Sequence, residues 1–126
     1  MKLLLDTNAL IWWFNDDPRL GPQTKSLIAN PRVAVSVSVA SFWEISIKHR
    51  LGKLDDCGSE LMSEVQQGRF SIIAITAQHL ELLECLPLRP EHKDPFDHII
   101  LVQAQATGAI LVTSDQRMRD YDVQCL

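Results

Sequence analysis

Residues 94–115 read DPFDHIILVQAQATGAILVTSD, and this stretch predicts a helix that leads directly into a strand. Asp94 is suited to cap the helix, and Pro95 suits its first position because proline lacks the N–H that would stay unpaired there. Gly108 is suited to end the helix, since glycine readily adopts the left-handed conformation that closes a helix. The apolar residues 109–113 then predict a buried strand. Such helix–strand units are the building blocks of a parallel sheet.

The same alternation of strands and helices extends over the rest of the chain. The expected strands are residues 2–5, 33–37, 71–75 and 109–113, with a possible edge strand at 122–125. The expected helices are residues 7–15, 22–29, 39–50, 60–67, 77–85 after a Thr76 cap, and 95–107, with a helical turn at 115–119. This order predicts an α/β fold with a central parallel sheet of about five strands and helices on both faces. There is neither a repeat nor a linker, so residues 1–126 are expected to form a single domain.

The helix expected at residues 39–50 has apolar side chains at helical spacing. Ser38 is suited to be its N-cap, because a serine hydroxyl accepts a hydrogen bond from the first turn. The apolar stripe consists of Val39, Phe42, Trp43 and Ile47. We expect this stripe to face the core.

Length and composition predict a globular protein with one core. The chain has 126 residues, of which 46% are apolar and 22% are charged. Its longest apolar runs, such as residues 9–14, are far too short to cross a bilayer. The run at residues 3–5 is broken by Asp6 and predicts a buried strand instead of a secretory signal. We therefore expect a soluble, cytoplasmic protein.

Cysteine and histidine patterns argue against a zinc site or a disulfide framework. The three cysteines, Cys57, Cys85 and Cys125, are widely spaced and form no CxxC motif. The four histidines form no HExxH motif and do not pair with cysteines at ligand spacing. Reduced thiols in a cytosol fit this pattern better.

The protein has a net charge of −4. Proteins that bind nucleic acid through their overall charge are positive, because lysine and arginine contact the negative phosphates. A local basic rim can nevertheless hold RNA around an acidic centre, if bound cations neutralise that centre. The charge therefore restricts how such a protein binds RNA without excluding it.

Four acidic residues are predicted to gather at one edge of the sheet. Asp6 follows the first strand, and Asp115 follows the strand at 109–113. Asp97 lies in the first turn of the helix that leads into that strand, and Glu44 lies in the helix after the second strand. All four can reach one crevice if the first and fourth strands are neighbours.

Each acid also has a structural interpretation. Asp6 and Asp115 can cap the helices that follow them, and Asp97 can complete a capping box behind Asp94. Glu44 can lie on a solvated helix face. Only the joint position of the four acids favours a functional site.

A cluster of carboxylates at such an edge calls for a cation, because their mutual repulsion would otherwise raise their pKa values. A ligand set made only of oxygen suits Mg²⁺ or Mn²⁺. Such an ion supports the hydrolysis of phosphodiester bonds. Neither a nucleophilic serine elbow nor a phosphate-binding Walker A loop is present as a competing motif.

Four segments resemble PIN-domain proteins, and more closely the toxins of bacterial VapBC-type toxin–antitoxin pairs. They are LLLDTNALIW at residues 3–12, SVASFWEISIK at 38–48, DPFDH at 94–98 and VTSD at 112–115. The resemblance implies a PIN fold and a Mg²⁺- or Mn²⁺-dependent endoribonuclease in which Asp6, Glu44, Asp97 and Asp115 bind metal and catalyse cleavage. It also implies a homodimer and a groove for an antitoxin segment. His98 departs from the pattern, since relatives often carry arginine there.

Further residues are expected to support the acids or to contact partners. The candidates for hydrogen bonds to the carboxylates or to metal-bound water are Thr7, Asn8, Thr113 and Ser114. The candidates for RNA contact are Lys48, Arg50, Lys93 and Arg117. The aromatic run at residues 12–14 cannot point in one direction from a helix, so part of it is expected to remain exposed for protein contact.

Two other functions remain open from the sequence. A phosphatase of the haloacid-dehalogenase type, or a phospho-acceptor receiver domain, also places an aspartate after the first parallel strand. However, Asp6-Thr7-Asn8 lacks the second acid of the phosphatase motif. A PIN-like binding module that has lost catalysis is the second alternative, against which the intact set of acids argues.

Overall fold

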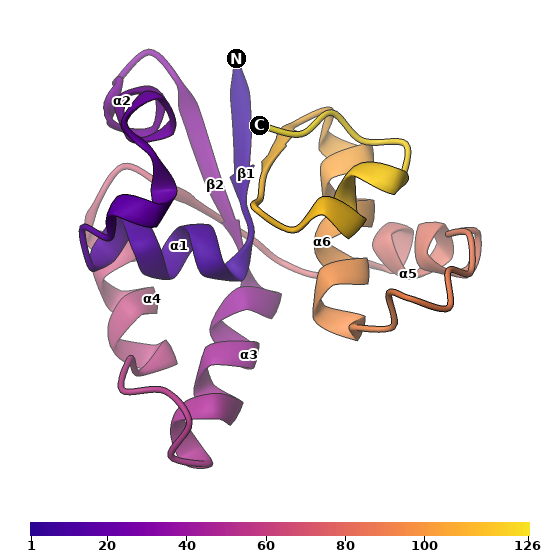
Figure 1. The fold of residues 1–126 in the computed structure, drawn as a ribbon, viewed down its shortest axis with the longest axis horizontal. Coiled ribbons are helices and arrows are strands. Elements are labelled where there is room, and N and C mark those ends of the chain that lie inside the picture. Colours follow the sequence, from indigo (N-terminus) through magenta and orange to yellow (C-terminus); the bar gives the residue numbers. More distant parts are fainter.

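A parallel sheet of four strands forms the centre of the protein in the computed structural model, which describes residues 1–126 (Figure 1). The strands are β1 (Lys2–Leu5), β2 (Ala34–Ser38), β3 (Ser71–Ile73) and β4 (Ile110–Val112), in the spatial order β3-β2-β1-β4. Leu5 of β1 is paired with Val37 of β2 and with Val112 of β4. The predicted fold class is therefore confirmed, and β1 and β4 are neighbours, which meets the condition for the four acids to share one crevice.

The predicted fifth strand is reduced to a single bridge. Leu111 and Cys125 form an isolated parallel bridge, and the backbone N–H groups of Leu111 and Leu126 complete its two hydrogen bonds. The chain turns between Tyr121 and Val123, where the Val123 N–H donates to the Tyr121 carbonyl. Only the last residues therefore reach the edge of β4, and the sheet has four strands instead of about five.

Six α-helices surround the sheet. They are α1 (Thr7–Phe14), α2 (Pro22–Ala29), α3 (Val39–Arg50), α4 (Gly58–Gln67), α5 (Ala77–Glu84) and α6 (Pro95–Thr107), with short 3-10 turns η1 (Pro18–Leu20) and η2 (Gln116–Asp120). The predicted caps are present, since the side chains of Ser38, Thr76 and Asp94 accept backbone N–H groups at the starts of α3, α5 and α6. Gly108 closes α6 in the left-handed conformation, with φ of 69°.

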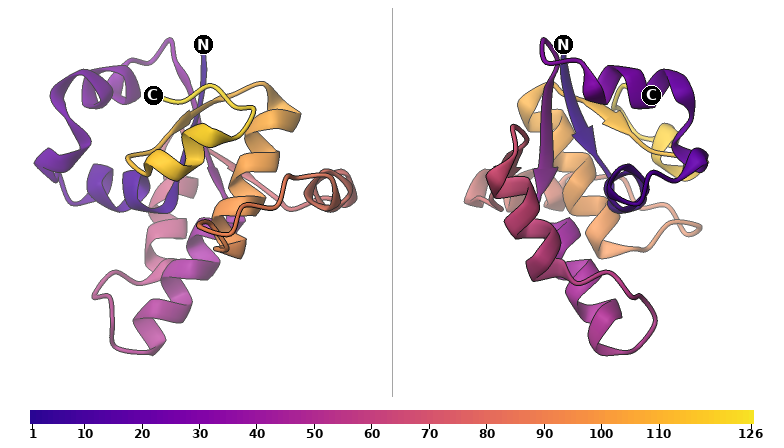
Figure 2. Two further views of the ribbon diagram at one scale, coloured as in Figure 1. Left: turned by 45° about the vertical axis from the view of Figure 1, so that its right-hand side comes forward. Right: turned by 90° about the vertical axis from the view of Figure 1, so that its left-hand side faces the viewer.

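The two faces of the sheet pack into two separate cores. Leu3 and Leu5 belong to a cluster with apolar side chains of α1, α2, α3 and α4. Leu4 belongs to a second cluster with α6 and the C-terminal segment. This division follows from the alternation of side chains along a strand, and each buried leucine contributes about 2 kcal/mol to stability. Figure 2 shows the helices on both sides of the sheet.

The carboxyl ends of the strands meet at one edge, which is where a site is expected in a parallel sheet. Figure 1 shows α1 and α3 starting at the lower ends of β1 and β2, and α6 starting on the same side of the molecule. None of the helices is both long enough and apolar enough to cross a membrane.

The predicted apolar stripe of α3 is wrong at one position. Trp43 is 57% exposed, and its ring packs edge-on against Phe96, with 4.9 Å between the ring centroids. The core-facing side of α3 instead contains Phe42 and Ile45, together with the buried Glu44. The helix turns Trp43 toward α6 because its opposite side is filled by the sheet, α1 and α4.

The aromatic residues 12–14 are all half-buried. Trp13 and Phe14 pack against the first core cluster, and the Trp13 ring lies 5.9 Å from that of Phe70. Trp12 lies outside this cluster, beneath the guanidinium of Arg19 at 5.1 Å. None of the three residues is exposed, so the expectation that part of this run remains exposed for protein contact is wrong.

Candidate functional site

The four acids singled out in the sequence converge at the carboxyl edge of the sheet. Asp6 directly follows β1, Asp115 comes three residues after β4, and Asp97 and Glu44 lie on α6 and α3. The pKa of Asp6 is raised to about 6, chiefly by burial, and the charges of Asp97 and Asp115 contribute to this rise. Burial also raises the pKa of Asp97, with contributions from the charges of Asp94 and Glu44. The acids are therefore close enough to influence one another's ionisation.

Asp6 combines a structural role with its place in the cluster. Its Oδ1 accepts a 2.8 Å hydrogen bond from the Ala9 N–H and so caps α1, while only 5% of the residue is exposed. The nearby Thr113 side chain partly offsets the rise in the pKa of Asp6. The capping interpretation and the site interpretation are thus compatible for this residue.

Glu44 is directed into the protein by its neighbours. The Thr7 hydroxyl donates a 2.7 Å hydrogen bond to Oε1, and Lys48 Nζ lies 2.8 Å from Oε2. Glu44 is only 6% exposed, so it does not lie on a solvated helix face. Both carboxylate oxygens are held in place.

Asp94 caps α6, which releases the Asp97 side chain for other contacts. The Asp94 Oδ1 accepts hydrogen bonds from the backbone N–H groups of Phe96 and Asp97, at 2.9 Å and 3.3 Å. Asp97 Oδ2 instead lies 2.9 Å from Nε2 of His92. The two acids of the DPFD segment therefore have different roles in the structure.

Asp115 is paired with a guanidinium. Arg117 contacts both of its carboxylate oxygens, with Nη2 at 2.8 Å from Oδ2 and Nε at 3.1 Å from Oδ1. These hydrogen bonds hold the pKa of Asp115 below its usual value. Asp115 also accepts the Arg117 N–H and so begins η2.

The donor atoms present fit a divalent cation. Ligand atoms of His92, Asp97 and Asp115 all lie within 4.8 Å of one another, and this group includes neither Asp6 nor Glu44. Oxygen-rich sets of this kind suit Mg²⁺ and Mn²⁺. Burial is the main cause of the raised pKa values of Asp6 and Asp97, and the charges of neighbouring acids add to both shifts. A bound cation would offset these effects.

Three of the four acids have a basic partner of their own. Glu44 pairs with Lys48, Asp97 with His92, and Asp115 with Arg117. Two of the residues predicted to contact RNA, Lys48 and Arg117, are therefore engaged with acids. The other two, Arg50 and Lys93, are exposed and form no hydrogen bond or salt bridge. Asp6 is the acid without a basic partner.

Two of the four polar neighbours predicted from the sequence contact the acids. Thr7 donates a hydrogen bond to Glu44, and Thr113 Oγ1 accepts the Asp115 N–H at 3.0 Å while its side chain lowers the pKa of Asp6. Asn8 and Ser114 are exposed, and their side chains form no hydrogen bond to an acid.

His92 belongs to the cluster although the sequence did not indicate it. Its position five residues before Asp97 matches no ligand motif. His98, in contrast, contacts protein only, because its Nε2 lies 2.9 Å from the His92 carbonyl oxygen and its ring packs against Tyr121. No local sequence signal could have revealed the contact between His92 and Asp97.

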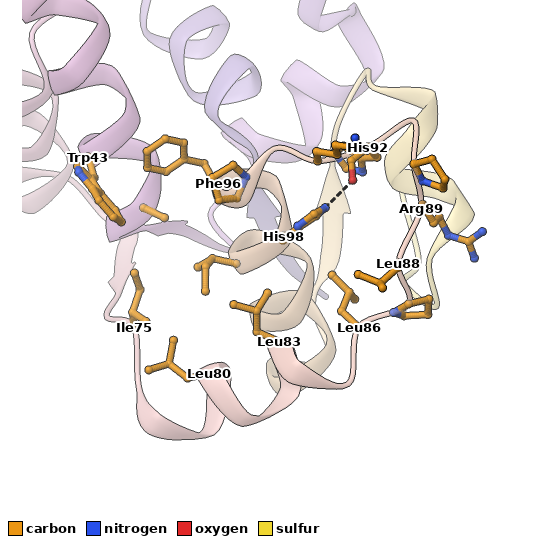
Figure 3. A pocket seen from close by; sticks show the side chains of 16 residues that line it. Trp43, Ile75, Leu80, Leu83, Leu86, Leu88, Arg89, His92, Phe96 and His98 are labelled. Carbon is orange, nitrogen blue, oxygen red and sulfur yellow. Dashed lines mark hydrogen bonds between the residues drawn. The ribbon is translucent and has the colours of Figure 1, made fainter.

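A large apolar groove lies beside the acids. Its volume is about 1070 Å³, and it lies between α3, α5 and the segment that leads into α6 (Figure 3). Trp43, Leu80 and Leu88 line this groove and are at least half exposed. His92 and Lys93 belong both to its wall and to the surroundings of Asp97.

Comparisons with known proteins identify the fold. The sequence pattern that defines the PIN domain matches residues 3–124. The VapBC2 structure from Rickettsia felis, bound to a promoter DNA fragment, is similar at 20% identity and a TM-score of 0.71, covering 100% of this chain and 98% of that one. A toxin–antitoxin complex from Klebsiella pneumoniae is similar at 25% identity and a TM-score of 0.64, covering 98% and 95%. VapC20 from Mycobacterium tuberculosis, a toxin that cleaves the sarcin–ricin loop, is similar at 16% identity and a TM-score of 0.68, covering 94% and 93%. No curated protein matches the sequence.

Proposed function

The chain belongs to the PIN domain family, and we propose that it is a Mg²⁺- or Mn²⁺-dependent endoribonuclease that hydrolyses phosphodiester bonds in RNA. The observation that carries this proposal is the approach of Asp97 and Asp115, whose ligand atoms lie within 4.8 Å of each other and of His92 although they come from separate elements. The charges of these two acids also contribute to the raised pKa of the buried Asp6. Capping of the two helical segments does not require these carboxylates to lie so close, and a shared cation would account for it.

In this proposal the acids hold the ion and the reacting water. Asp6, Asp97 and Asp115 would bind the cation, and Glu44 would bind it or orient the attacking water. When bound, Mg²⁺ or Mn²⁺ lowers the pKa of a water molecule and stabilises the charge that develops on the phosphodiester. Thr7 holds Glu44 in position, and Thr113 accepts a hydrogen bond from the Asp115 N–H.

The surroundings of the acids would hold the RNA. Arg50 and Lys93 are exposed cations without an acidic partner, and we assign them to contacts with phosphates. Lys48 and Arg117 are paired with Glu44 and Asp115. They would contact phosphate once these two acids bind a cation instead. An acidic protein can in this way bind RNA at a locally neutralised centre.

We further propose that the protein is the toxin of a toxin–antitoxin pair, and that it binds a cognate antitoxin and a second copy of itself. Similar chains come from such complexes, and exposed apolar side chains around the groove support contact with protein. Induced expression should then arrest growth, and co-expression of the cognate antitoxin should relieve the arrest. Arrest by an Asp97→Asn variant would contradict a toxic role of RNA cleavage.

The nuclease activity is tested with purified protein and mixed cellular RNA, in Mn²⁺ or in EDTA, with mapping of the new RNA ends. We expect discrete cuts in Mn²⁺ only, and their loss in Asp97→Asn. That variant should fold normally, because Asp94 and not Asp97 caps α6. Asp55→Asn changes an exposed acid in the loop between α3 and α4 and serves as the control. A protein that binds Mn²⁺ but cuts no RNA would favour the inactive binding module, and undiminished cleavage by Asp97→Asn would remove Asp97 from the mechanism.

A further inference from the structure

We propose that His92 is a positioning residue of the site, which holds the carboxylate of Asp97 in the orientation that binds the cation. The inference rests on the proposed function, since it deepens the role of Asp97 as a metal ligand. It assigns a role to a residue that no motif of the sequence contains.

The contact between the two side chains is short and buried. Nε2 of His92 lies 2.9 Å from Oδ2 of Asp97, and the His92 side chain is fully buried while that of Asp97 is 16% exposed. Nδ1 of His92 is buried without a hydrogen-bond partner. An unpaired acceptor is tolerated in protein interiors better than an unpaired N–H, so Nε2 carries the proton and donates it to Asp97.

The imidazole is itself held by a braced turn at residues 89–92. The His92 N–H closes the turn on the Arg89 carbonyl at 3.0 Å, and His98 donates to the His92 carbonyl at 2.9 Å (Figure 3). Arg117 donates to the Glu91 carbonyl at 3.1 Å. These bonds attach the turn to α6 and to η2, which begin next to Asp97 and Asp115.

Aromatic packing fixes the remaining freedom of the ring. The His92 ring lies 5.1 Å from that of His98 and 5.5 Å from that of Tyr121, in edge-to-face arrangements. The rings of His98 and Tyr121 lie 6.2 Å from each other, so the three rings form one packed cluster. This packing restrains the His92 ring and favours one orientation of the Asp97 carboxylate that it contacts.

Burial distinguishes a positioning role from direct ligation. A cation that enters from solvent meets the partly exposed oxygens of Asp97 and Asp115, whereas His92 lies behind them with no exposed surface. Metal sites commonly place a hydrogen-bonding residue behind a ligand, and its removal costs about 10- to 100-fold in metal affinity or activity.

The test compares three variants of the full chain by their affinity for Mn²⁺ alone. His92→Leu removes the donor and keeps the site apolar, and we expect it to weaken Mn²⁺ binding by about 10- to 100-fold. His92→Gln keeps an N–H donor at similar reach and should restore most of the affinity. His79→Leu removes another buried histidine, on α5, and should leave Mn²⁺ binding unchanged.

Two spectroscopic measurements make the inference specific. In the metal-free protein, ¹⁵N spectra should show His92 protonated at Nε2 and not at Nδ1. In the Mn²⁺-bound protein, electron spin echo spectra should show no nitrogen of His92 bound directly to Mn²⁺. The spectra of the parent and of His92→Gln should therefore agree in this respect. The opposite tautomer, or a nitrogen bound to Mn²⁺, would overturn the positioning role even if His92→Leu failed to fold.

The outcomes also separate this inference from the proposed function. A parent protein that binds Mn²⁺ and cuts RNA, with a folded His92→Leu variant of equal Mn²⁺ affinity, contradicts the role of His92 alone. A parent protein that neither binds Mn²⁺ nor cuts RNA contradicts the proposed function. The positioning role of His92 then fails with it, because there is no metal ion for Asp97 to bind.

Discussion

The Thr7 hydroxyl donates a 2.7 Å hydrogen bond to Oε1 of Glu44, although 37 residues separate the two in the chain. Thr7 begins α1, and Glu44 lies in the middle of α3. A position within a helix does not by itself direct a glutamate toward a site, but a buried donor on the neighbouring helix does. This bond therefore aligns the first helix after β1 with the acid of the helix after β2.

Thr7→Val should lower RNA cleavage about tenfold, because it keeps the side-chain shape but removes the donor that orients Glu44. Loss of one buried hydrogen bond costs about 1–3 kcal/mol, and each 1.4 kcal/mol in the barrier is about tenfold in rate. Single-turnover cleavage at saturating Mn²⁺ measures the effect. Thr107→Val, at the far end of α6, is the matched control. Equal rates for both variants would exclude an orienting role of Thr7.

Asp6 should make the metal-free protein less stable as the pH rises. Its pKa is about 6 in the folded protein, against an ordinary value of 3.8 for aspartate. The folded state therefore favours the neutral form. Between about pH 4 and pH 7 the ionisation of Asp6 therefore costs about 3 kcal/mol of folding free energy. Relative to the parent, the free energy of unfolding of Asp6→Asn should increase by that amount between low and neutral pH. Urea unfolding in EDTA measures it. A pH-independent difference between the two proteins would contradict the buried state of Asp6.

Lys93→Gln should weaken RNA binding more than Lys48→Gln. Lys93 is exposed without an acidic partner, whereas the Lys48 ammonium is paired with Glu44 at 2.8 Å. Binding is measured in an Asp97→Asn background, so that RNA stays intact, over a range of salt concentrations. Loss of one phosphate contact lowers the slope of log affinity against log salt by about one. Arg32→Gln, before β2 at the opposite edge of the sheet, should change neither quantity, and a larger effect of Lys48→Gln would reverse the assignment.

Gly58→Ala should destabilise the protein, although alanine usually favours a helix. Gly58 begins α4 against α3, where an added Cβ would meet the Ser46 hydroxyl and would lie 2.5 Å from the Phe42 carbonyl oxygen. Backbone cannot yield easily, so we expect a loss of about 1–3 kcal/mol in the free energy of unfolding. At Gly68 the nearest atom to such a Cβ is 3.5 Å away, and Gly68→Ala should be neutral or stabilising. Equal stability of both variants would show that α4 packs less closely on α3.

The helix starts and the succession of strands and helices were accessible from the sequence because their causes are local. Ser38, Thr76 and Asp94 cap helices through bonds to backbone groups two or three residues away. The order of the strands in the sheet, which places Asp6 and Asp115 after neighbouring parallel strands, was decided by the tertiary structure. The predicted edge strand failed for a related reason, since a turn at Tyr121 leaves too few residues to pair.

The sequence alone thus determined the α/β fold and the edge of the sheet at which the acids gather, because caps, periodicity and strand ends depend on near neighbours. Only the tertiary structure decided which way the side chains point: Glu44 inward onto Thr7, Trp43 outward against Phe96. It also brought His92 to Asp97 across a braced turn. Burial, charge pairing and pKa depend on contacts between separate elements, and no pattern along one element contains them.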